Sequence, residues 1–416
     1  MTSLALSGAA QILRPSQDGL PCLRGDAVPS QTLSPGGLSV LDGAIAGFEP
    51  DGAADLVIDA SDCAVIPGFV DCHTHLPFAG WRATEYEQKL RGVPYEEISR
   101  GGGGIAASAR ALRSSPDEAV LRQSRGLAAE MLAAGTTCFE GKSGYGLSRD
   151  GELRSLRLGR ALAQAVPQTT VSTALLAHAV PPGFSASGWM DEVEAMLPEV
   201  LKLGSVSALD IFVETIAFSN EDLSRMGALA AAAGLGLHAH VEQFASHGSV
   251  PVALAAGARS VDHLSMLAAS DVGPLAGAEC AAVLLPAAEF LGAEHRAPGR
   301  ALLDAGAIVV LASDLNPGTA PVTSMPLVIG LGSRMYDMSV REALAAATLN
   351  AAWTLGLERV CGSIEVGKRA DLLVLDCPVE QIAYRLGRNP VAIVLVAGEP
   401  VYVRDPQAAA RITGRS

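Results

Sequence analysis

His73 and His75 lie at the end of an apolar run, in the segment PGFVDCHTHLPF, and are separated by a single residue. Successive side chains of a β-strand point to opposite faces, so these two imidazoles would share a face and could bind one metal ion. Two histidines of a core or a surface explain the same spacing about equally well. Their position at the end of an expected strand, directly after Asp71, favours the metal site.

Three later segments end in the same way. GLGLHAHVEQF contains His238 and His240, one of which is a candidate third ligand, SVDHL contains His263, and VVLASDLNPGT contains Asp314. A carboxylate at the end of a buried run needs a partner, because its burial without one is costly, and a metal ion or a histidine is such a partner. The simpler alternatives are a structural histidine at 263 and a turn or helix-capping aspartate at 314.

Taken in chain order, these segments give His-x-His, His, His and Asp, a set that is more specific than any of its members. Imidazoles and a carboxylate suit a divalent ion such as Zn²⁺ or Fe²⁺. With an open coordination position, such an ion lowers the pKa of a bound water, which can then attack an electrophilic carbon while the aspartate moves the proton. The set therefore predicts a metal-dependent hydrolase.

The elements that must position these residues follow from the texture of the chain. From about residue 67 to 360, apolar strand-like runs alternate with Ala- and Leu-rich helical runs, and SVREALAAATLNAAWTLGL is expected to form one helix. Such alternation predicts a parallel sheet. We therefore expect an α/β fold, a (β/α)₈ TIM-like barrel over residues 67–360, whose active site lies at the carboxyl ends of the strands.

Both ends of the chain are rich in expected strands instead. Residues 1–66 alternate short apolar clusters with Gly, Asp and Pro, and residues 361–416 contain the strand-like DLLVLDC and PVAIVLVAGEPVYV. Two β-rich segments that flank one barrel are most economically joined in one unit. We expect them to form a small β-sandwich domain from both termini.

Composition limits the partners and the compartment. The 416 residues include 30 Lys plus Arg and 44 Asp plus Glu, a net charge of −14, which argues against a nucleic-acid or anionic-membrane partner. There is no apolar stretch of ~18 residues and no basic region before an apolar run at the N-terminus, so neither a membrane span nor a signal peptide is expected. Seven cysteines without a CxxC motif predict a reduced, cytoplasmic protein.

Longer motifs resemble the imidazolonepropionase family of the amidohydrolase superfamily, which acts in histidine degradation. The similar stretches run almost from end to end, and KSGYG and AHAVPP are particular to this family rather than general in the superfamily. The stretches are PGFVDCHTHLPFAGWRATEYEQKLRGVPYEEISRGGGGI, TTCFEGKSGYGLS, LLAHAVPP, HVEQF, SVDHL, LLPAAEFLG, LASDLNPGTAPVTSMPLVI and GSIEVGKRADLLVLD.

The resemblance implies a role for each matching position. The implied metal ligands are His73, His75, His240 and Asp314, with one Zn²⁺ or Fe²⁺/Fe³⁺ ion, and the implied catalytic residues are Asp314 and His263. The implied substrate-binding residues are Arg82, Tyr95, Tyr145, His178 and Gln243. The implied reaction opens the cyclic amide of 4-imidazolone-5-propionate, a small carboxylate, to N-formimino-L-glutamate, and the implied assembly is a homodimer. An arginine can hold the propionate in a bidentate manner, and tyrosine hydroxyls can add hydrogen bonds.

Some positions depart from the family pattern. Gln243 stands where some members have a glutamate that activates water, and a glutamine cannot act as a general base. The neighbouring Glu242 is expected on the opposite face of its strand, so proton transfer falls on Asp314 and His263. Cys72 replaces a proline that commonly precedes the first histidine pair. These changes leave open a related hydantoin, thio-imidazolone acid or aminohydrolase substrate, and a metal-binding scaffold without catalysis is the least favoured alternative.

Overall fold

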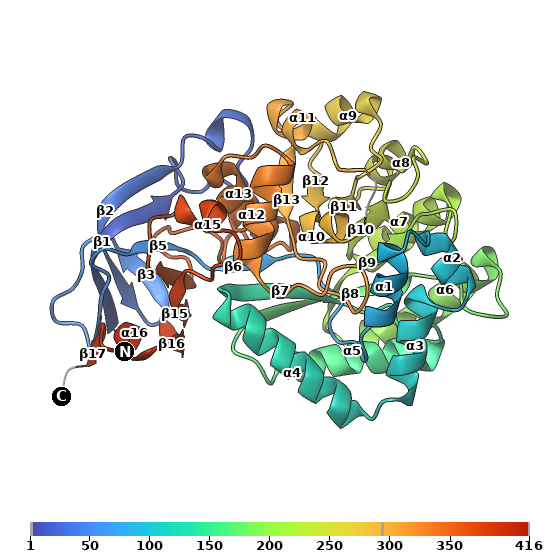
Figure 1. Cartoon of the computed structure of the whole chain (residues 1–416), viewed down its shortest axis with the longest axis horizontal. Coiled ribbons are helices and arrows are strands. Elements are labelled where there is room, and N and C mark those ends of the chain that lie inside the picture. The colour runs from blue at the N-terminus through green and yellow to red at the C-terminus, as the bar shows by residue number, and fades with distance from the viewer. Residues whose placement is uncertain (1–2, 293–294, 415–416) are drawn as a thin grey trace.

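The computed structural model describes residues 3–292 and 295–414, without the side chains of residues 95 and 96. It places a barrel of eight parallel strands beside a smaller mixed sheet that both ends of the chain build (Figure 1). The barrel takes up the middle of the chain. This arrangement confirms the predicted (β/α)₈ class with an appended β unit from the termini.

The barrel strands follow one another around the sheet in chain order, each parallel to the next. The last strand meets the first through a parallel bridge between Thr74 and Leu315. Beside this bridge, the Asp71 carboxylate accepts hydrogen bonds from the backbone N–H of Ser313 at 3.0 Å and from its hydroxyl at 2.5 Å. The eight strands are β6 (Phe69–Asp71), β7 (Thr136–Lys142), β8 (Thr169–Ala177), β9 (Val206–Phe212), β10 (Gly236–Val241), β11 (Ser260–His263), β12 (Ala281–Leu284) and β13 (Ile308–Leu311).

Helices cover the outside of the barrel in Figure 1, because parallel strands are joined by crossover segments that pack on the sheet. Several begin at a serine whose hydroxyl accepts a backbone N–H bond, and the cap Ser219 forms a capping box with Asp222. The helices are α1 (Ala83–Leu90), α2 (Tyr95–Arg100), α3 (Gly104–Ser114), α4 (Asp117–Ala133), α5 (Arg149–Ala163), α6 (Ala186–Lys202), α7 (Asn220–Ala233), α8 (Ser249–Ala255), α9 (Val272–Ala276), α10 (Pro286–Phe290), α11 (Gly299–Asp304), α12 (Met325–Met335), α13 (Val340–Ala346) and α14 (Leu349–Thr354), with the 3₁₀ turn η2 (Ala269–Asp271).

The segment expected as one helix after residue 339 is divided into α13 and α14, so that expectation was wrong. Thr348, between them, has φ −131° and ψ −95°, outside the helical region. The backbone N–H of Val70 in β6 donates to the Ala347 carbonyl at 3.0 Å. Because the Ala347 carbonyl accepts this bond from the barrel strand, it is directed away from the helix axis, and the helix ends at this point.

The terminal sheet joins residues that are hundreds of positions apart. The 12-residue β1 pairs antiparallel with β2 and parallel with both β4 and β5, so the sheet branches along this strand. A separate apolar cluster, including Leu6, Ile58 and Leu372, packs on it. Its strands are β1 (Ser3–Arg14), β2 (Thr32–Leu41), β3 (Ala44–Gly47), β4 (Leu56–Asp59), β5 (Ala64–Pro67), β14 (Leu372–Leu375), β15 (Val391–Val396), β16 (Glu399–Val403) and β17 (Ile412–Gly414), with the short helices η1 (Gly25–Ala27), α15 (Gln381–Tyr384) and α16 (Pro406–Ala409).

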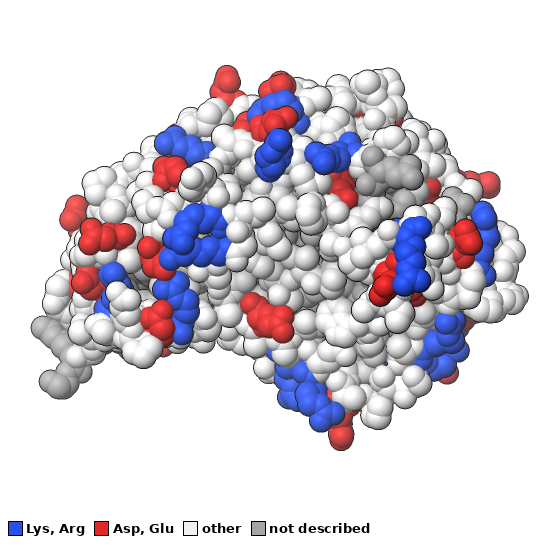
Figure 2. Space-filling view, viewed as in Figure 1, with Lys and Arg blue, Asp and Glu red and all other residues white. Residues whose placement is uncertain are grey.

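The surface mixes charges of both signs. On the face drawn in Figure 2, basic and acidic side chains are interspersed around the rim, and the centre of the face is largely uncharged. Among the helices that the structure describes, none combines the length and the apolar character that crossing a bilayer would require.

Candidate active site

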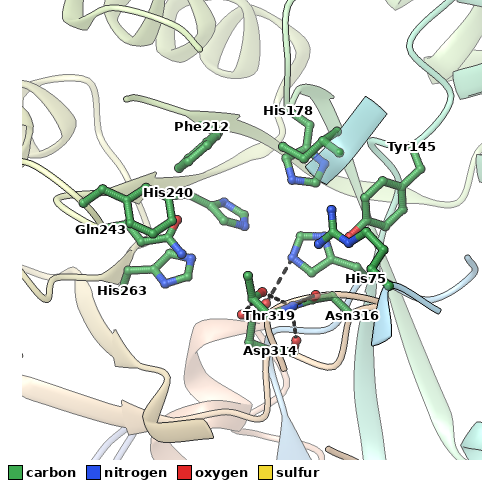
Figure 3. Close-up of a pocket in the computed structure, with 13 residues that line it drawn as sticks. His75, Tyr145, His178, Phe212, His240, Gln243, His263, Asp314, Asn316 and Thr319 are labelled. Atoms are coloured by element: carbon green, nitrogen blue, oxygen red, sulfur yellow. Dashed lines mark hydrogen bonds and ion pairs between the residues drawn. The ribbon is translucent and has the colours of Figure 1, made fainter. Parts of the chain in front are cut away.

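The four candidate metal ligands converge at the carboxyl end of the barrel, and Figure 3 shows three of them, His75, His240 and Asp314. His73 and His75 follow β6, His240 lies in β10 and Asp314 follows β13. One ligand atom from each histidine lies within 4.8 Å of the other two. Oδ1 of Asp314 is 3.3 Å from Nε2 of His75 and 3.6 Å from Nε2 of His73. Residues separated by up to 241 positions are thus brought to one point, and all four are buried.

These side chains suit a divalent cation. The Nε2 atoms of His73 and His240 are buried and make no hydrogen bond within the described chain. Burial lowers the pKa of His73 and of His75 well below the ordinary value, so both imidazoles are neutral, as metal ligands must be. Buried nitrogens without partners cost about 1–3 kcal/mol each, and coordination of an ion would remove that cost.

Carboxylates behind two of the histidines fix which ring nitrogen faces the site. Nδ1 of His73 lies 2.6 Å from Oδ2 of Asp262, and Nδ1 of His240 lies 3.0 Å from Oδ1 of Asp210. When Nδ1–H donates to a carboxylate, the Nε2 lone pair remains for an ion. Burial alone would lower the pKa of His240, but the Asp210 carboxylate reverses this and holds it above its ordinary value. An ion at Nε2 would therefore compete with a proton for this imidazole.

The sequence prediction did not include Asp210 and Asp262. A signal for them was present, since each is a charged residue within an apolar strand run, ALDIF and SVDHL. Both are fully buried in the structure. A carboxylate in such a run needs a partner, and that rule was applied to Asp314 alone.

The predicted catalytic residues stand on strained backbone. His263 has φ +80° and Asp314 has φ +55°, and Leu264 and Glu242 also have positive φ. Residues other than glycine seldom adopt this region, which costs of order 1 kcal/mol or more, and such residues concentrate at functional sites. Here each lies at or just past the end of a barrel strand. The turn aims the side chains of His263 and Asp314 back over the barrel mouth, where both line the pocket.

The loop after Asp314 holds this carboxylate. The Asn316 amide donates to the Asp314 carbonyl at 2.7 Å and to the Thr319 hydroxyl at 2.7 Å, and that hydroxyl lies 3.4 Å from Asp314 Oδ2. Asn316 also accepts from the backbone N–H groups of Gly318 and Thr319. Asn316, Gly318 and Thr319 therefore form a turn that fixes the loop after Asp314. Burial raises the pKa of Asp314 above its ordinary value, so this carboxylate accepts a proton more readily than an exposed aspartate does.

A small pocket opens above the candidate ligands. Of the residues predicted to bind substrate, Arg82, Tyr145, His178 and Gln243 line it. The side chain of Tyr95 lies outside the described residues. The remaining lining residues are His75, Ile105, Phe212, His240, Phe244, His263, Asp314, Asn316 and Thr319.

Arg82 is the cation of this pocket, and a glycine makes room for it. A Cβ on Gly318 would lie only 1.8–2.1 Å from the guanidinium atoms. The backbone N–H of Arg82 donates to the carbonyl of Pro317 at 2.8 Å, and its Nε lies 3.6 Å from the Glu85 carboxylate. The guanidinium therefore rests on the loop that carries Asp314. A larger residue at 318 would displace it.

Tyr145 and His178 also line the pocket. The His178 ring stacks on His75, with centroids 5.2 Å apart and planes at 16°, and its Nδ1 lies 3.1 Å from the Gly144 carbonyl. Burial holds the pKa of His178 well below the ordinary value, so this imidazole is neutral. Nδ1 then donates to Gly144, and Nε2 is an acceptor.

His238 and Glu242 are engaged elsewhere. Nδ1 of His238 lies 2.7 Å from the Ser260 hydroxyl, deeper in the barrel than His240, and burial lowers its pKa to about 3. The Glu242 carboxylate accepts the backbone N–H groups of His247 and Ser249 at 2.9 and 2.6 Å. The Glu242 carboxylate thus binds the backbone at the start of α8. Its side chain does not line the pocket.

Residues 64–401 match the model of the amidohydrolase family. Among curated relatives, the imidazolonepropionase of Rubrobacter xylanophilus is 44% identical, over 84% of this chain and 84% of its own. The imidazolonepropionase of Pseudomonas entomophila is 42% identical, over 85% of this chain and 90% of its own. That of Yersinia enterocolitica is 40% identical, over 88% and 92%.

Solved structures share the fold at low sequence identity. An adenosine deaminase from Xanthomonas campestris with bound zinc superposes with a TM-score of 0.72 at 20% identity, covering 99% of this chain and 96% of its own. A triazine hydrolase variant gives 0.74 at 16% identity, covering 98% of both chains. These likenesses extend over barrel and terminal sheet together.

Proposed function

The chain belongs to the amidohydrolase family and, within it, to the imidazolonepropionases, and from that premise we propose that it hydrolyses the ring amide of 4-imidazolone-5-propionate to N-formimino-L-glutamate. The observation that carries the proposal is one pocket with two kinds of group. Buried His75, His240 and Asp314 line its floor beside His73, and Arg82 lies in its wall. The floor suits hydrolysis of an amide, and the arginine suits a carboxylate tail.

His73, His75, His240 and Asp314 would hold one divalent ion, Zn²⁺ or Fe²⁺, with N and O donors that suit either. Such an ion supplies Lewis acidity, which lowers the pKa of water and polarises the ring carbonyl. The donor atoms themselves support a single ion, because the carboxylates Asp210 and Asp262 are already paired with histidine nitrogens.

Asp314 and His263 divide the proton and charge chemistry between them. Asp314 takes the proton from the attacking water and passes it to the ring nitrogen as the amide C–N bond breaks. Burial lowers the pKa of His263 to about 3, so its imidazole is neutral at physiological pH. A neutral imidazole donates one hydrogen bond, and His263 directs it to the oxyanion that develops on the ring carbonyl.

Arg82, Tyr145 and His178 orient the substrate. The guanidinium binds the propionate in a bidentate manner, the tyrosine hydroxyl donates to the same end of the molecule, and His178 offers a neutral acceptor to a ring N–H. Binding energy from the tail, which does not react, places the ring carbonyl over the floor of the pocket. Gln243 completes the wall as a hydrogen-bonding group and not as a base.

The direct test is turnover of freshly prepared imidazolonepropionate by protein loaded with Zn²⁺ or Fe²⁺, with the metal content measured by elemental analysis. We expect ring opening to N-formimino-L-glutamate that a chelator abolishes. If metal-replete protein left the ring intact, imidazolonepropionate would not be the substrate. If the protein bound no ion, the proposed metal-dependent mechanism would be wrong as well.

The role of Arg82 is tested with a panel of cyclic amides. For substrates that carry a carboxylate tail, Arg82→Ala should raise KM by 10- to 100-fold, equivalent to ~1.4–2.7 kcal/mol of binding. For amides without the tail, including hydantoin, the variant and the parent protein should give equal KM values. A preference of the parent protein for a compound without a carboxylate would contradict the assigned role.

A further inference from the structure

A lysine lies beneath the candidate metal ligands, fully buried among carboxylates. Nζ of Lys142, at the end of β7, is 2.7 Å from Asp210 Oδ2, 2.9 Å from Glu140 Oε2 and 3.7 Å from Asp262 Oδ2. The exposed fraction of each of these four side chains is at most 1%. Four ionisable groups thus share one interior position, on strands β7, β9 and β11.

Two of these carboxylates are those that orient metal ligands. Asp210 uses its other oxygen, Oδ1, for Nδ1 of His240, and Asp262 uses Oδ2 for Nδ1 of His73. The other oxygen of Asp262, Oδ1, accepts a hydrogen bond from the Ser260 hydroxyl at 2.6 Å. A continuous path therefore runs from His240 through Asp210, Lys142 and Asp262 to His73.

The third carboxylate serves Lys142 without touching a ligand. Glu140 accepts a short hydrogen bond from the Thr173 hydroxyl and faces Nζ with its other oxygen. Burial raises the pKa of Glu140 to about 7, although the Lys142 ammonium acts to lower it. A nearby ammonium favours the ionised form of a buried carboxylate, because an opposite charge within ~4–6 Å stabilises that form.

We propose that Lys142 is a positioning residue for the metal centre: its ammonium anchors Asp210 and Asp262 and thereby aims Nε2 of His240 and of His73 at one ion. The inference rests on the proposed metal site. It also accounts for the grouping of Asp210, His240 and Asp262, three potential ligands whose donor atoms lie within 4.8 Å of one another. The Lys142 ammonium lies beside Asp210 and Asp262 and is the fixed cation of this cluster.

The test uses a double variant that leaves the net buried charge unchanged. Lys142→Met alone would leave three carboxylates without their cation, which could prevent folding. Glu140→Gln with Lys142→Met removes one charge of each sign, and both histidine-bound aspartates remain. Glu140→Gln alone is the matched control, since it changes a carboxylate that contacts Lys142 but no candidate ligand. A second double variant, Glu140→Gln with Lys142→Gln, provides an alternative without charge if the methionine version does not fold.

The measurement is transfer of Zn²⁺ from the loaded full-length protein to a chelator of known affinity, together with the visible absorption of the Co²⁺-loaded protein. Circular dichroism with and without chelator establishes that each variant folds. We expect the double variants to bind Zn²⁺ roughly 10- to 100-fold more weakly, as loss of groups that orient ligands typically does. We also expect their Co²⁺ bands to shift, while the control stays within about threefold of the parent protein.

A folded double variant with parental Zn²⁺ affinity and an unchanged Co²⁺ spectrum would overturn the inference. An equal loss of affinity in the control would overturn it too, because the effect would then belong to Glu140. Neither measurement uses a substrate. Both results are therefore independent of whether imidazolonepropionate is the compound that the protein hydrolyses.

Discussion

One carboxylate, Asp314, performs two tasks in the proposed mechanism. It lies within 3.6 Å of Nε2 of both His73 and His75, and it faces the pocket where the water would stand. Its left-handed backbone conformation is what turns the side chain into that position. Asparagine tolerates the same conformation better than most residues do. Replacing only one oxygen by an NH₂ group therefore isolates the chemistry from the backbone.

Asp314→Asn should retain the fold and lose turnover by ~10²–10⁴-fold, the range expected when a general base is removed. The measurement is kcat at saturating substrate with the metal content determined in parallel. Asp337→Asn is a matched control, because Asp337 also has a positive φ, +52°, but is exposed and does not line the pocket. Turnover of the position-314 variant near that of the control would exclude Asp314 as the base.

At the scale of elements, the site depends on how loops leave the strands. The loop after β7, residues 143–148, is wrapped around a carboxylate from the first turns of α5. Glu152 accepts backbone N–H bonds from Gly144 at 2.9 Å, Gly146 at 2.7 Å and Leu147 at 3.0 Å. Converging backbone N–H groups form a natural anion-binding concavity. The loop so held carries Tyr145 and supplies the carbonyl that fixes His178.

Gly144 shows how tightly this loop is fitted. Its φ is +115°, and a Cβ there would come within 2.8 Å of Nδ1 of His178. Tyr145 and His178 are therefore placed by the same few backbone atoms, with ring centroids 5.2 Å apart. Loosening the loop would affect the substrate-binding wall and leave the metal ligands on β6, β10 and β13 in place.

Glu152→Gln should accordingly raise KM by roughly tenfold, equivalent to ~1.4 kcal/mol, with a smaller change in kcat and an unchanged metal content. Steady-state kinetics and elemental analysis separate the three quantities. Glu365→Gln is the control, because Glu365 is a buried carboxylate between α14 and β14 that also accepts several hydrogen bonds. If kcat and metal content fell while KM stayed constant, the loop would serve the floor of the pocket and not its wall.

At the scale of the whole molecule, the ends of the chain are joined by buried polar contacts as well as by the terminal sheet. Glu365 accepts from the backbone N–H of Gly19 at 2.5 Å, from Ser363 and from Lys368 at 2.8 Å. Burial alone would raise the pKa of Glu365, but these donors outweigh it and hold the pKa below its ordinary value of 4.5. Such a carboxylate stabilises the folded state only while it is ionised.

Glu365→Gln should lower the free energy of unfolding by ~1 kcal/mol at pH 7. Because the folded pKa is depressed, this contribution is complete above pH 4.5 and disappears as pH falls through the folded value. The stability difference between variant and parent should therefore narrow below pH 4.5, measured by urea unfolding at several pH values. A difference that stays constant down to the lowest pH would contradict the sign of the shift.

The distribution of charge sets a further condition on function. The chain carries −14, and the face in Figure 2 mixes both signs, so the molecule as a whole offers no attraction to a carboxylate substrate. Attraction must be local, and Arg82 in the pocket wall supplies it. The homodimer and the cytoplasmic location stay predictions.

The sequence by itself determined the residue types of the floor and the class of fold. A strand places alternate residues on one face, and the ends of parallel strands meet at one rim, so His73, His75, His263 and Asp314 could be assigned to a common site from local pattern alone. The strand–helix alternation likewise predicted the barrel. Where a local pattern gave the wrong result, as for the single helix after residue 339, the reason was a hydrogen bond from Val70, 277 positions away.

Only the tertiary structure decided which groups contact and orient the residues that line the pocket. The links of Lys142 with Asp210 and Asp262, and of Glu152 with its loop, depend on strand register and on how neighbouring loops turn. Register between sequence-distant strands is fixed by the packing of the whole barrel, which no short segment contains. The choice between His238 and His240, left open by the residues alone, depends in the same way on depth along β10, where His240 lies nearer the rim.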